Sequence, residues 1–165
     1  MRQFHFVING KDSTLRRIIN MQGIRCIINC TTTVATVTIS NTTLLWSDPK
    51  AWPSGVIPVE GDAVEIVPGA NIALDINTPM LKSLTINGRL SYLVNETNPL
   101  NLTIHTNWIY VYAGEFLIGN ETHPYNGEAS IILYGAPTDE SLYMSNYVEA
   151  GNKVMAINGL VKFFG

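Results

Sequence analysis

The chain is poor in charged residues and has no excess of positive charge. Charged residues make up 14% of its 165 residues and hydrophobic residues 46%, whereas an average soluble domain is roughly 25% charged. This composition argues against a disordered chain, which combines low hydrophobicity with strong net charge. Asp and Glu (13) outnumber Lys and Arg (10). The sequence thus lacks a basic stripe that would bind phosphates, and no nucleic-acid partner is expected.

Long apolar runs and a cysteine framework are also missing. No apolar run approaches the roughly 18 residues of a membrane-spanning helix, so we expect no direct membrane insertion by this segment. Cys26 and Cys30 are too few for a disulfide framework and match neither a zinc set nor a redox Cys-x-x-Cys motif. On one extended strand they would lie roughly 13 Å apart, too far to bridge, whereas a turn between them would allow pairing. Their disulfide state stays open.

Helix signals are nearly absent as well. Only Lys11–Met21 (KDSTLRRIINM) has some helical character, and its β-branched residues make it a weak case. The sequence that follows alternates between strand-like segments and turns, and Thr33–Ser40 (TVATVTIS) predicts a strand. A chain of this length fits one ordinary domain. The sequence therefore predicts an all-β fold.

A weak internal repeat says most about the architecture. Apolar alternations flank glycines at positions 69, 88, 114, 135 and 159, which are 19, 26, 21 and 24 residues apart. A strand-glycine-strand unit of this size cannot bury its inner face alone. Units of this period can stack as the rungs of a right-handed parallel β-helix-like coil. Glycine at the bend permits backbone angles that a residue with a Cβ resists.

The coil predicts which strands stack and which side chains are buried. Ile66, Ile86, Ile109 and Ile157 should face the core. The five segments expected to stack in parallel are Val64–Ile66, Leu84–Ile86, Ile109–Val111, Ile131–Leu133 and Met155–Ile157. The competing architecture is an antiparallel β-sandwich, in which Asn87-Gly88 and Asn158-Gly159 would form hairpins. Hairpin units usually take about 8–12 residues, so the longer period favours the coil.

Acceptor motifs for N-linked glycans bear on the compartment. The pattern Asn-x-Ser/Thr occurs five times, at Asn29, Asn41, Asn95, Asn101 and Asn120, where chance gives about 2.3. This excess predicts an extracellular or cell-surface glycoprotein whose acceptor asparagines are exposed, because a glycan cannot be buried. The first residues hold too short an apolar stretch for a signal peptide. We therefore expect a segment of a longer protein.

A series of motifs between Leu45 and Gly165 resembles a known family in order and spacing. The motifs are Leu45-Trp46-Ser47, Trp52-Pro53-Ser54-Gly55, Gly61-Asp62, Leu84-Thr85-Ile86-Asn87-Gly88, Ile131-Ile132-Leu133-Tyr134-Gly135 and Gly151-Asn152-Lys153-Val154. The family is the G-eight domain, named for eight glycines and found in fibrocystin, fibrocystin-like proteins and cell-surface or secreted hyaluronan-degrading proteins. We assign residues 45–165 to a G-eight-like β domain. Residues 1–44 stay unassigned and could be the tail of a preceding domain.

The resemblance also implies a biological setting. It implies a module of a large, mostly extracellular, often membrane-anchored protein, in which the domain leads into parallel β-helix repeats. We therefore expect a non-catalytic structural or adhesive module. Its expected partners are the neighbouring domains of the same parent protein and extracellular glycans or proteins, and no cofactor is expected. The alternative is a module that binds or depolymerises glycans of the hyaluronan type, although no catalytic residue can be carried across.

A strip of aromatic residues is the candidate binding site. In the segment NWIYVYAG, Trp108, Tyr110 and Tyr112 share the outward face of a strand, whereas Ile109 and Val111 face the core. Exposed rings beside polar groups suit the apolar faces of sugars or a protein partner. The alternative is that the N-terminal residues or a neighbouring domain cover the strip.

A weaker candidate is a metal site. Glu121 and His123 lie two residues apart in GNETHPYNG, and both could point one way and bind a metal together with a third ligand. No third ligand is visible in the sequence. The alternative is a turn anchored by Pro124 and Gly127.

Other conspicuous residues have structural interpretations. Trp46 and Trp52 are expected to plug one end of the β core. Asp62 and Asp75 are expected to bond the backbone of their own turns. Asp62 with Glu65 and Asp139 with Glu140 lie near each other in the sequence, but the sequence does not show the spacing that a glycosidase pair needs. Because no nucleophile with a base can be identified, no hydrolytic activity is expected of this domain alone.

Overall fold

The computed structural model describes residues 7–8, 11–12, 38–145 and 148–165. The chain forms two compact units, Met1–Ala35 and Thr36–Gly165. In the first unit, β1 (Val7–Ile8) pairs antiparallel with β2 (Lys11–Asp12).

Several N-terminal predictions fall partly or wholly outside the described residues. The weak helical signal over Lys11–Met21 is not realised at Lys11 and Asp12, which form β2, and its remainder lies outside the described residues. Residues 38–40 form no strand, and the rest of the strand predicted over Thr33–Ser40 is likewise outside them. Cys26, Cys30 and Asn29 also lie outside the described residues.

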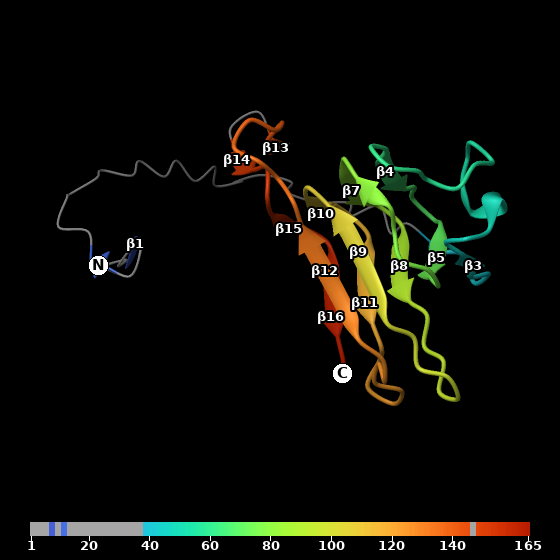
Figure 1. The fold of residues 1–165 in the computed structure, drawn as a ribbon. Coiled ribbons are helices and arrows are strands. Elements are labelled where there is room, and N and C mark those ends of the chain that lie inside the picture. Colours follow the sequence, from blue (N-terminus) through green and yellow to red (C-terminus); the bar gives the residue numbers. More distant parts are fainter. Residues whose placement is uncertain (1–6, 9–10, 13–37, 146–147) are drawn as a thin grey trace, which may run out of the picture. The chain divides into compact units, whose positions relative to one another are not determined.

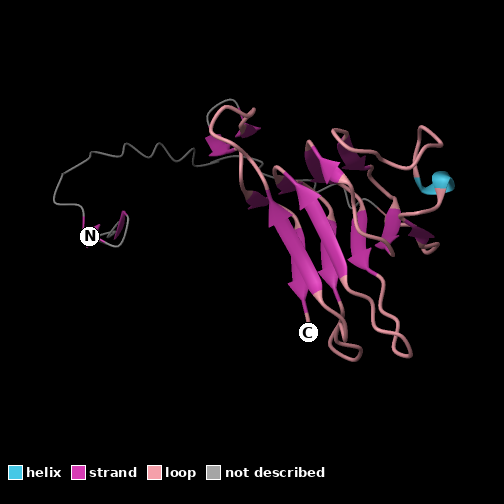
Figure 2. Ribbon diagram, viewed as in Figure 1, coloured by secondary structure: helices cyan, strands magenta, loops and turns pink. Residues whose placement is uncertain are grey.

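The second unit is all-β and contains three parallel sheets (Figures 1 and 2). The four-stranded sheet holds β4 (Ala63–Ile66), β7 (Ser83–Ile86), β10 (Ile109–Val111) and β15 (Met155–Ile157). The five-stranded sheet holds β3 (Leu44–Leu45), β5 (Asn71–Leu74), β8 (Arg89–Tyr92), β11 (Glu115–Ile118) and β16 (Leu160–Phe163). The three-stranded sheet holds β6 (Met80–Leu81), β9 (Leu102–Thr106) and β12 (Ala129–Leu133). A short 3-10 helix, η1 (Pro49–Ala51), follows β3.

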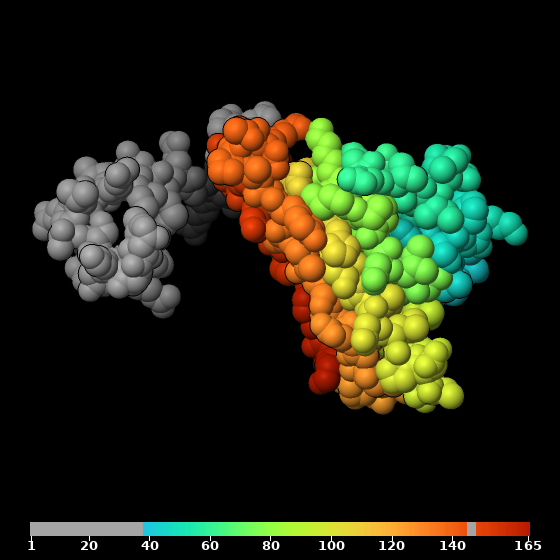
Figure 3. All heavy atoms as spheres, in the orientation of Figure 1, coloured from blue at the N-terminus to red at the C-terminus, as the bar shows by residue number. Residues whose placement is uncertain are grey.

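The chain visits these sheets in a fixed cycle. β4, β5 and β6 form the first cycle, β7, β8 and β9 the second, and β10, β11 and β12 the third; β15 and β16 then return to the first two sheets. Figure 3 shows the yellow β9 segment beside the orange β12 segment, two strands that pair in parallel. An antiparallel pair, β13 (Leu142–Ser145) with β14 (Val148–Gly151), interrupts the cycle before β15.

The predicted parallel stack is confirmed for four of its five segments. Val64, Leu84, Ile109 and Met155 lie in register across the four-stranded sheet. Ile131–Leu133 instead belongs to β12 and pairs with β9 in the three-stranded sheet. The prediction was misled by Gly135, which follows β12, whereas the other four glycines of the repeat precede the second strand of a cycle.

The predicted burial of the isoleucines is correct for three of the four. Ile66, Ile86 and Ile109 are fully buried, but Ile157 is 47% exposed. Ile157 lies in register with the buried Val111. Its strand, β15, ends the four-stranded sheet and has a strand neighbour on one side only. The inward side chains of the last strand are therefore left partly uncovered.

The repeat glycines serve the close stacking of successive bends. A Cβ on Gly114 would lie 2.1 Å from the carbonyl oxygen of Gly88, and a Cβ on Gly159 would lie 2.3 Å from that of Gly114. Neither glycine has a positive φ, so the expectation of a special bend angle is met at Gly69 (φ 84°) and not at these two. The Asn-Gly pairs accordingly join strands of different sheets and form no hairpins.

The two tryptophans close the N-terminal end of the core, as predicted. Trp46 and Trp52 are 0% and 7% exposed, and their rings meet edge to face with centroids 4.7 Å apart. The Nε1 atom of Trp52 donates a hydrogen bond of 2.9 Å to the carbonyl oxygen of Trp46. Among the described residues, no helix has the length and apolar character to cross a membrane.

Candidate functional site

The outer face of the five-stranded sheet carries rows of aligned side chains. Ile72, Leu90 and Phe116 lie in register and are buried on its inner face. The residues on either side of them therefore point outward, because successive side chains of a strand alternate. One outward row consists of Asn71, Arg89, Glu115 and Leu160, and the next of Ala73, Ser91, Leu117 and Lys162.

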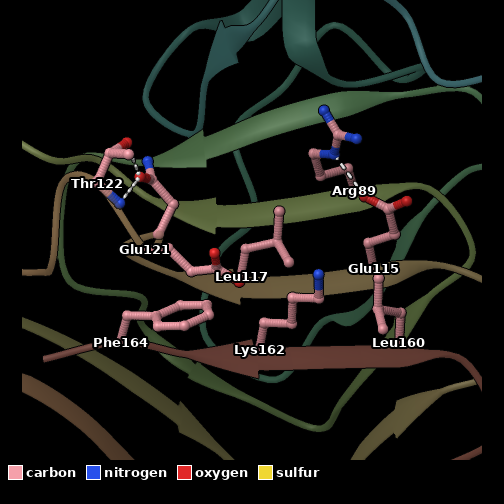
Figure 4. Close-up of a pocket in the computed structure, with 10 residues that line it drawn as sticks. Arg89, Glu115, Leu117, Glu121, Thr122, Leu160, Lys162 and Phe164 are labelled. Atoms are coloured by element: carbon pink, nitrogen blue, oxygen red, sulfur yellow. Dashed lines mark hydrogen bonds and ion pairs between the residues drawn. The ribbon is translucent and has the colours of Figure 1, made fainter.

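A groove runs over these rows. Its larger part is a hollow of about 440 Å³. Figure 4 shows Arg89 and Glu115 at one end of it, Phe164 and Thr122 at the other, and Leu117 between them. A second hollow of about 250 Å³ shares Arg89, Leu117, Gly119 and Asn120 with the first and extends to Asn71. We call the two together the outer groove.

The charges of the outer groove are partly neutralised within it. Arg89 Nε lies 2.7 Å from Glu115 Oε2, and the two side chains are 35% and 29% exposed. A pair so open to solvent contributes little to stability, but it fixes two planar polar groups side by side. Lys162 and Glu121 add one charge of each sign to the lining. The groove therefore combines an apolar floor with polar groups of both signs.

A tightly bonded turn forms one wall of the groove. Asn120 Oδ1 accepts hydrogen bonds from the backbone nitrogen of Thr122 (2.9 Å), from Thr122 Oγ1 (2.8 Å) and from the backbone nitrogen of His123 (2.8 Å). The backbone nitrogen of Tyr125 donates to the carbonyl oxygen of Phe164 (2.8 Å). These bonds hold the turn against the end of β16.

The structure places Glu121 and His123 in this turn, both exposed. His123 Nε2 lies 3.4 Å from Glu96 Oε1, and His123 Nδ1 lies 2.9 Å from Thr122 Oγ1. Glu121 lines the outer groove. Within residues 38–145 and 148–165, no three His, Cys, Asp or Glu side chains come together as a set that could hold a metal.

The aromatic strip lies on the outer side of the four-stranded sheet. Ile109 and Val111 are fully buried, so the predicted alternation along β10 is correct. Trp108 and Tyr110 are half-buried, and Tyr112 is 49% exposed. The rings of Tyr110 and Tyr112 meet edge to face, with centroids 5.4 Å apart. Burial, and secondarily the neighbouring Tyr112, raises the pKa of Tyr110 above its ordinary value.

The acceptor asparagines within the described part of the chain are exposed. Asn41, Asn95, Asn101 and Asn120 lie outside the strands, as predicted for sites that could carry glycans. Asn95 Oδ1 accepts from the backbone nitrogen of Asn98, and Asn101 Oδ1 accepts from that of Glu128, both at 3.0 Å. Only Asn120 among the four lines a hollow of the outer groove.

Comparison of the sequence with known protein families identifies the family of this chain. The G8 domain family matches residues 51–165. The chain belongs to the G8 domain family. The resemblance to the G-eight domain noted in the sequence is thereby confirmed.

This G8 domain matches short segments of much longer proteins, so the chain spans only a small part of the length of these relatives. Mouse fibrocystin is 34% identical over 122 residues, which cover 73% of this chain and 3% of fibrocystin. Dog fibrocystin is 31% identical over 121 residues, which cover 72% of this chain and 3% of that protein. Communication mutant protein F of Dictyostelium discoideum is 29% identical over 115 residues, which cover 68% of this chain and 10% of that protein. No solved structure matches the chain.

The outer groove of this G8 domain was missed in the sequence. Its charged residues come from strands far apart in the chain, and single motifs do not connect them. A signal was nevertheless present, because Arg89, Glu115 and Leu160 each follow a repeat glycine directly. Once the bends stack, these positions must align in one row.

Proposed function

We propose that this G8 domain is a non-catalytic, extracellular structural module of a larger fibrocystin-like cell-surface protein. In this proposal the three sheets are the faces of one parallel, right-handed β coil. Neighbouring domains of the parent protein are its first partners. The family match and the small share of fibrocystin that the chain covers support the view of a module within a long protein.

The observation that carries the proposal is the contrast between the two ends of the stack. At the N-terminal end, Trp46 and Trp52 seal the core. At the other end, Ile157 and Phe163 are 47% and 45% exposed. In register with them, Val111 and Ile118 of the preceding strands are 0% and 7% exposed. Such a surface is completed when another element of the parent chain stacks on β15 and β16.

The test compares this chain with a longer piece of its parent protein. Ile157→Cys and Phe163→Cys should react quickly with a thiol reagent in the chain alone and several-fold more slowly in the longer piece. Val59→Cys is the control, because Val59 is 58% exposed near the sealed end and should react equally in both. Peptide mapping separates these sites from the native cysteines. Equal labelling of Ile157→Cys in the two proteins would refute the proposal.

The bonding of the aspartates supports a non-catalytic role. Asp62 accepts a hydrogen bond from the backbone nitrogen of Val59, at 2.9 Å, and Asp139 accepts one from that of Ala136, at 2.7 Å. Asp75 accepts from both the backbone nitrogen (3.0 Å) and the Oγ atom (2.6 Å) of Ser47. Asp62 and Asp139 hold their own turns together, as expected for Asp62, whereas Asp75 ties the end of β5 to the residue after Trp46 and does not cap its own bend. We therefore expect no cleavage of hyaluronan by this chain.

Glycan binding is the second candidate function, and the exposed rings of the aromatic strip favour it. A sugar could stack on Tyr112 beside Tyr110, where each ring supplies about 1 kcal/mol beyond burial. The test is a glycan panel that includes hyaluronan, with Tyr112→Ala and a matched control, Tyr134→Ala. Tyr134 is 47% exposed on another part of the surface. Loss of binding in Tyr112→Ala alone supports the strip, and unchanged binding in both variants clears it of any role.

A further inference from the structure

We propose that a glycan attached to Asn120 lies in the outer groove and covers it. The inference rests on the proposed extracellular function, because the attachment occurs in the secretory pathway. The proposed occupant of the groove, the glycan, is covalently attached to the same protein. It also separates Asn120 from the other acceptor asparagines, whose glycans would extend into solvent.

The position of Asn120 is the first argument. Asn120 begins the acceptor motif Asn120-Glu121-Thr122 and lines both hollows of the outer groove. The first sugar on its Nδ2 atom would therefore start at the wall that the two hollows share. Asn95 and Asn101 also begin acceptor motifs, but neither lines these hollows.

The second argument is that the side chain of Asn120 is held in place. Its Oδ1 atom accepts three hydrogen bonds, two from backbone nitrogens and one from Thr122 Oγ1. The turn that carries it is bonded to Phe164 at the end of β16. With Oδ1 fixed, the direction of Nδ2 is fixed as well. An attached sugar therefore begins from a defined point instead of from a freely rotating side chain.

The third argument is the chemistry of the lining. A pyranose ring has apolar faces and a polar rim, so it suits a site with an apolar floor and hydrogen-bonding groups at the edges. Leu117 and Phe164 supply the floor, and Arg89, Glu115 and Lys162 supply donors and acceptors around it (Figure 4). The larger hollow alone has about 440 Å³, within the roughly 300–1,000 Å³ typical of ligand sites.

The attachment of the glycan needs one co-reactant, a lipid-linked oligosaccharide, and with it the atoms and electrons of the reaction balance. Asn120 Nδ2 loses a proton and forms a bond to C1 of the first N-acetylglucosamine. The bond between that C1 and the pyrophosphate of the lipid carrier breaks, and the carrier leaves as a lipid pyrophosphate that takes the bonding electron pair. The proton passes to the base of the transferase. No oxidant or reductant is needed.

The first experiment is to express the chain behind a secretion signal and map its glycopeptides. We expect a glycan on Asn120. If Asn95 or Asn101 is modified while Asn120 is bare, this inference fails and the extracellular assignment stands. If none of the described acceptor sites is modified, the extracellular assignment itself loses support.

The second experiment asks whether the attached glycan occupies the groove. Acylation of Lys162 should be several-fold slower in the glycosylated protein than after an amidase has removed the glycan. Lys153 is exposed outside the groove and should react equally in both forms. The amidase converts Asn120 to aspartate, so bacterially produced Asn120→Asp serves as a reference for that change. Equal acylation of Lys162 in the two forms would overturn the inference.

The third experiment measures the melting temperature. Trimming to a single N-acetylglucosamine should preserve the melting temperature, and complete removal should lower it by about 2–4 °C, a shift that corresponds to about 1 kcal/mol in a chain of this size. Leu117→Ser should abolish this difference, whereas Tyr134→Ala, outside the groove, should leave it intact. A difference that persists unchanged in Leu117→Ser would show that the glycan acts elsewhere.

Discussion

At the scale of single residues, the glycines and aspartates have roles that their chemistry explains. Asp62 binds the backbone of its own turn, as its position beside turn residues predicts, whereas Asp75 binds Ser47, which lies 28 residues earlier in the chain. The need for glycine at 114 could not be predicted in the same way. It depends on the carbonyl oxygen of Gly88, an atom 26 residues away that comes close only when the bends stack. A steric requirement between distant residues leaves no local pattern.

Replacement of Gly114 by alanine should destabilise the domain. The new Cβ would meet the carbonyl oxygen of Gly88 at 2.1 Å, and the shift that relieves such overpacking typically costs about 1–3 kcal/mol. Denaturant unfolding measures the change. Gly55→Asn is the control, because a Cβ at Gly55 meets nothing within 4 Å and asparagine tolerates a positive φ. Equal midpoints for Gly114→Ala and the parent chain would contradict the stacking of the bends.

The buried phenol of Tyr92 predicts how stability responds to alkali. Burial, with a smaller effect of Tyr125, raises the pKa of Tyr92 above its ordinary value of 10.0. The unfolded chain therefore loses this proton near pH 10 while the folded chain keeps it. The stabilising effect is fully present below pH 10 and falls above it, by at most about 1.4 kcal/mol per pH unit.

Tyr92→Phe tests this assignment. The variant should be about 1 kcal/mol less stable at neutral pH, because the carbonyl oxygen of Ser130 loses its 2.8 Å hydrogen bond from Tyr92. Above pH 10 its unfolding free energy should fall less steeply than that of the parent chain. Unfolding curves between pH 8 and about pH 11 give both slopes. Identical slopes would show that Tyr92 titrates alike in the folded and unfolded chains.

At the scale of elements, the sequence predicted the first strand of each cycle better than the third. The segments around Ile66, Ile86 and Ile109 alternate clearly, and all three isoleucines are buried. β6 has two residues and carries too little pattern to be recognised. β12 was assigned to the wrong sheet. The alternation within one strand predicts that strand but not the strand it pairs with. The aromatic strip followed from alternation within one strand, whereas the outer groove needed the alignment of several.

The short elements at the N-terminal end should contribute strongly to stability. Trp46→Ala removes a fully buried ring, and we expect a loss of about 3–5 kcal/mol. Trp108→Ala is the matched control, since Trp108 is half-buried and should cost less than about 2 kcal/mol. Urea unfolding of both variants decides the matter. A smaller loss for Trp46→Ala than for Trp108→Ala would mean that β3 and η1 do not seal the core.

At the scale of the whole molecule, the chain divides between Ala35 and Thr36. A chain of residues 36–165 should fold and melt at the temperature of the same unit in the full chain. Further truncation to residues 48–165 removes β3 and Trp46 and should lower the melting temperature by about 10 °C or more. Calorimetry of the three proteins measures this. A 36–165 chain that fails to fold would show that the two units depend on each other.

The antiparallel pair β13–β14 gives the molecule a site for engineering. Its strands belong to none of the three parallel sheets, and the register of β15 is set by β10 and not by the residues between β12 and β15. Doubling the length of a flexible loop costs only about 0.6 kcal/mol in closure entropy. A peptide epitope or a fluorescent label inserted next to Ser141 should therefore be displayed without disturbing the sheets. This G8 domain could in that way serve as a rigid carrier for a foreign loop.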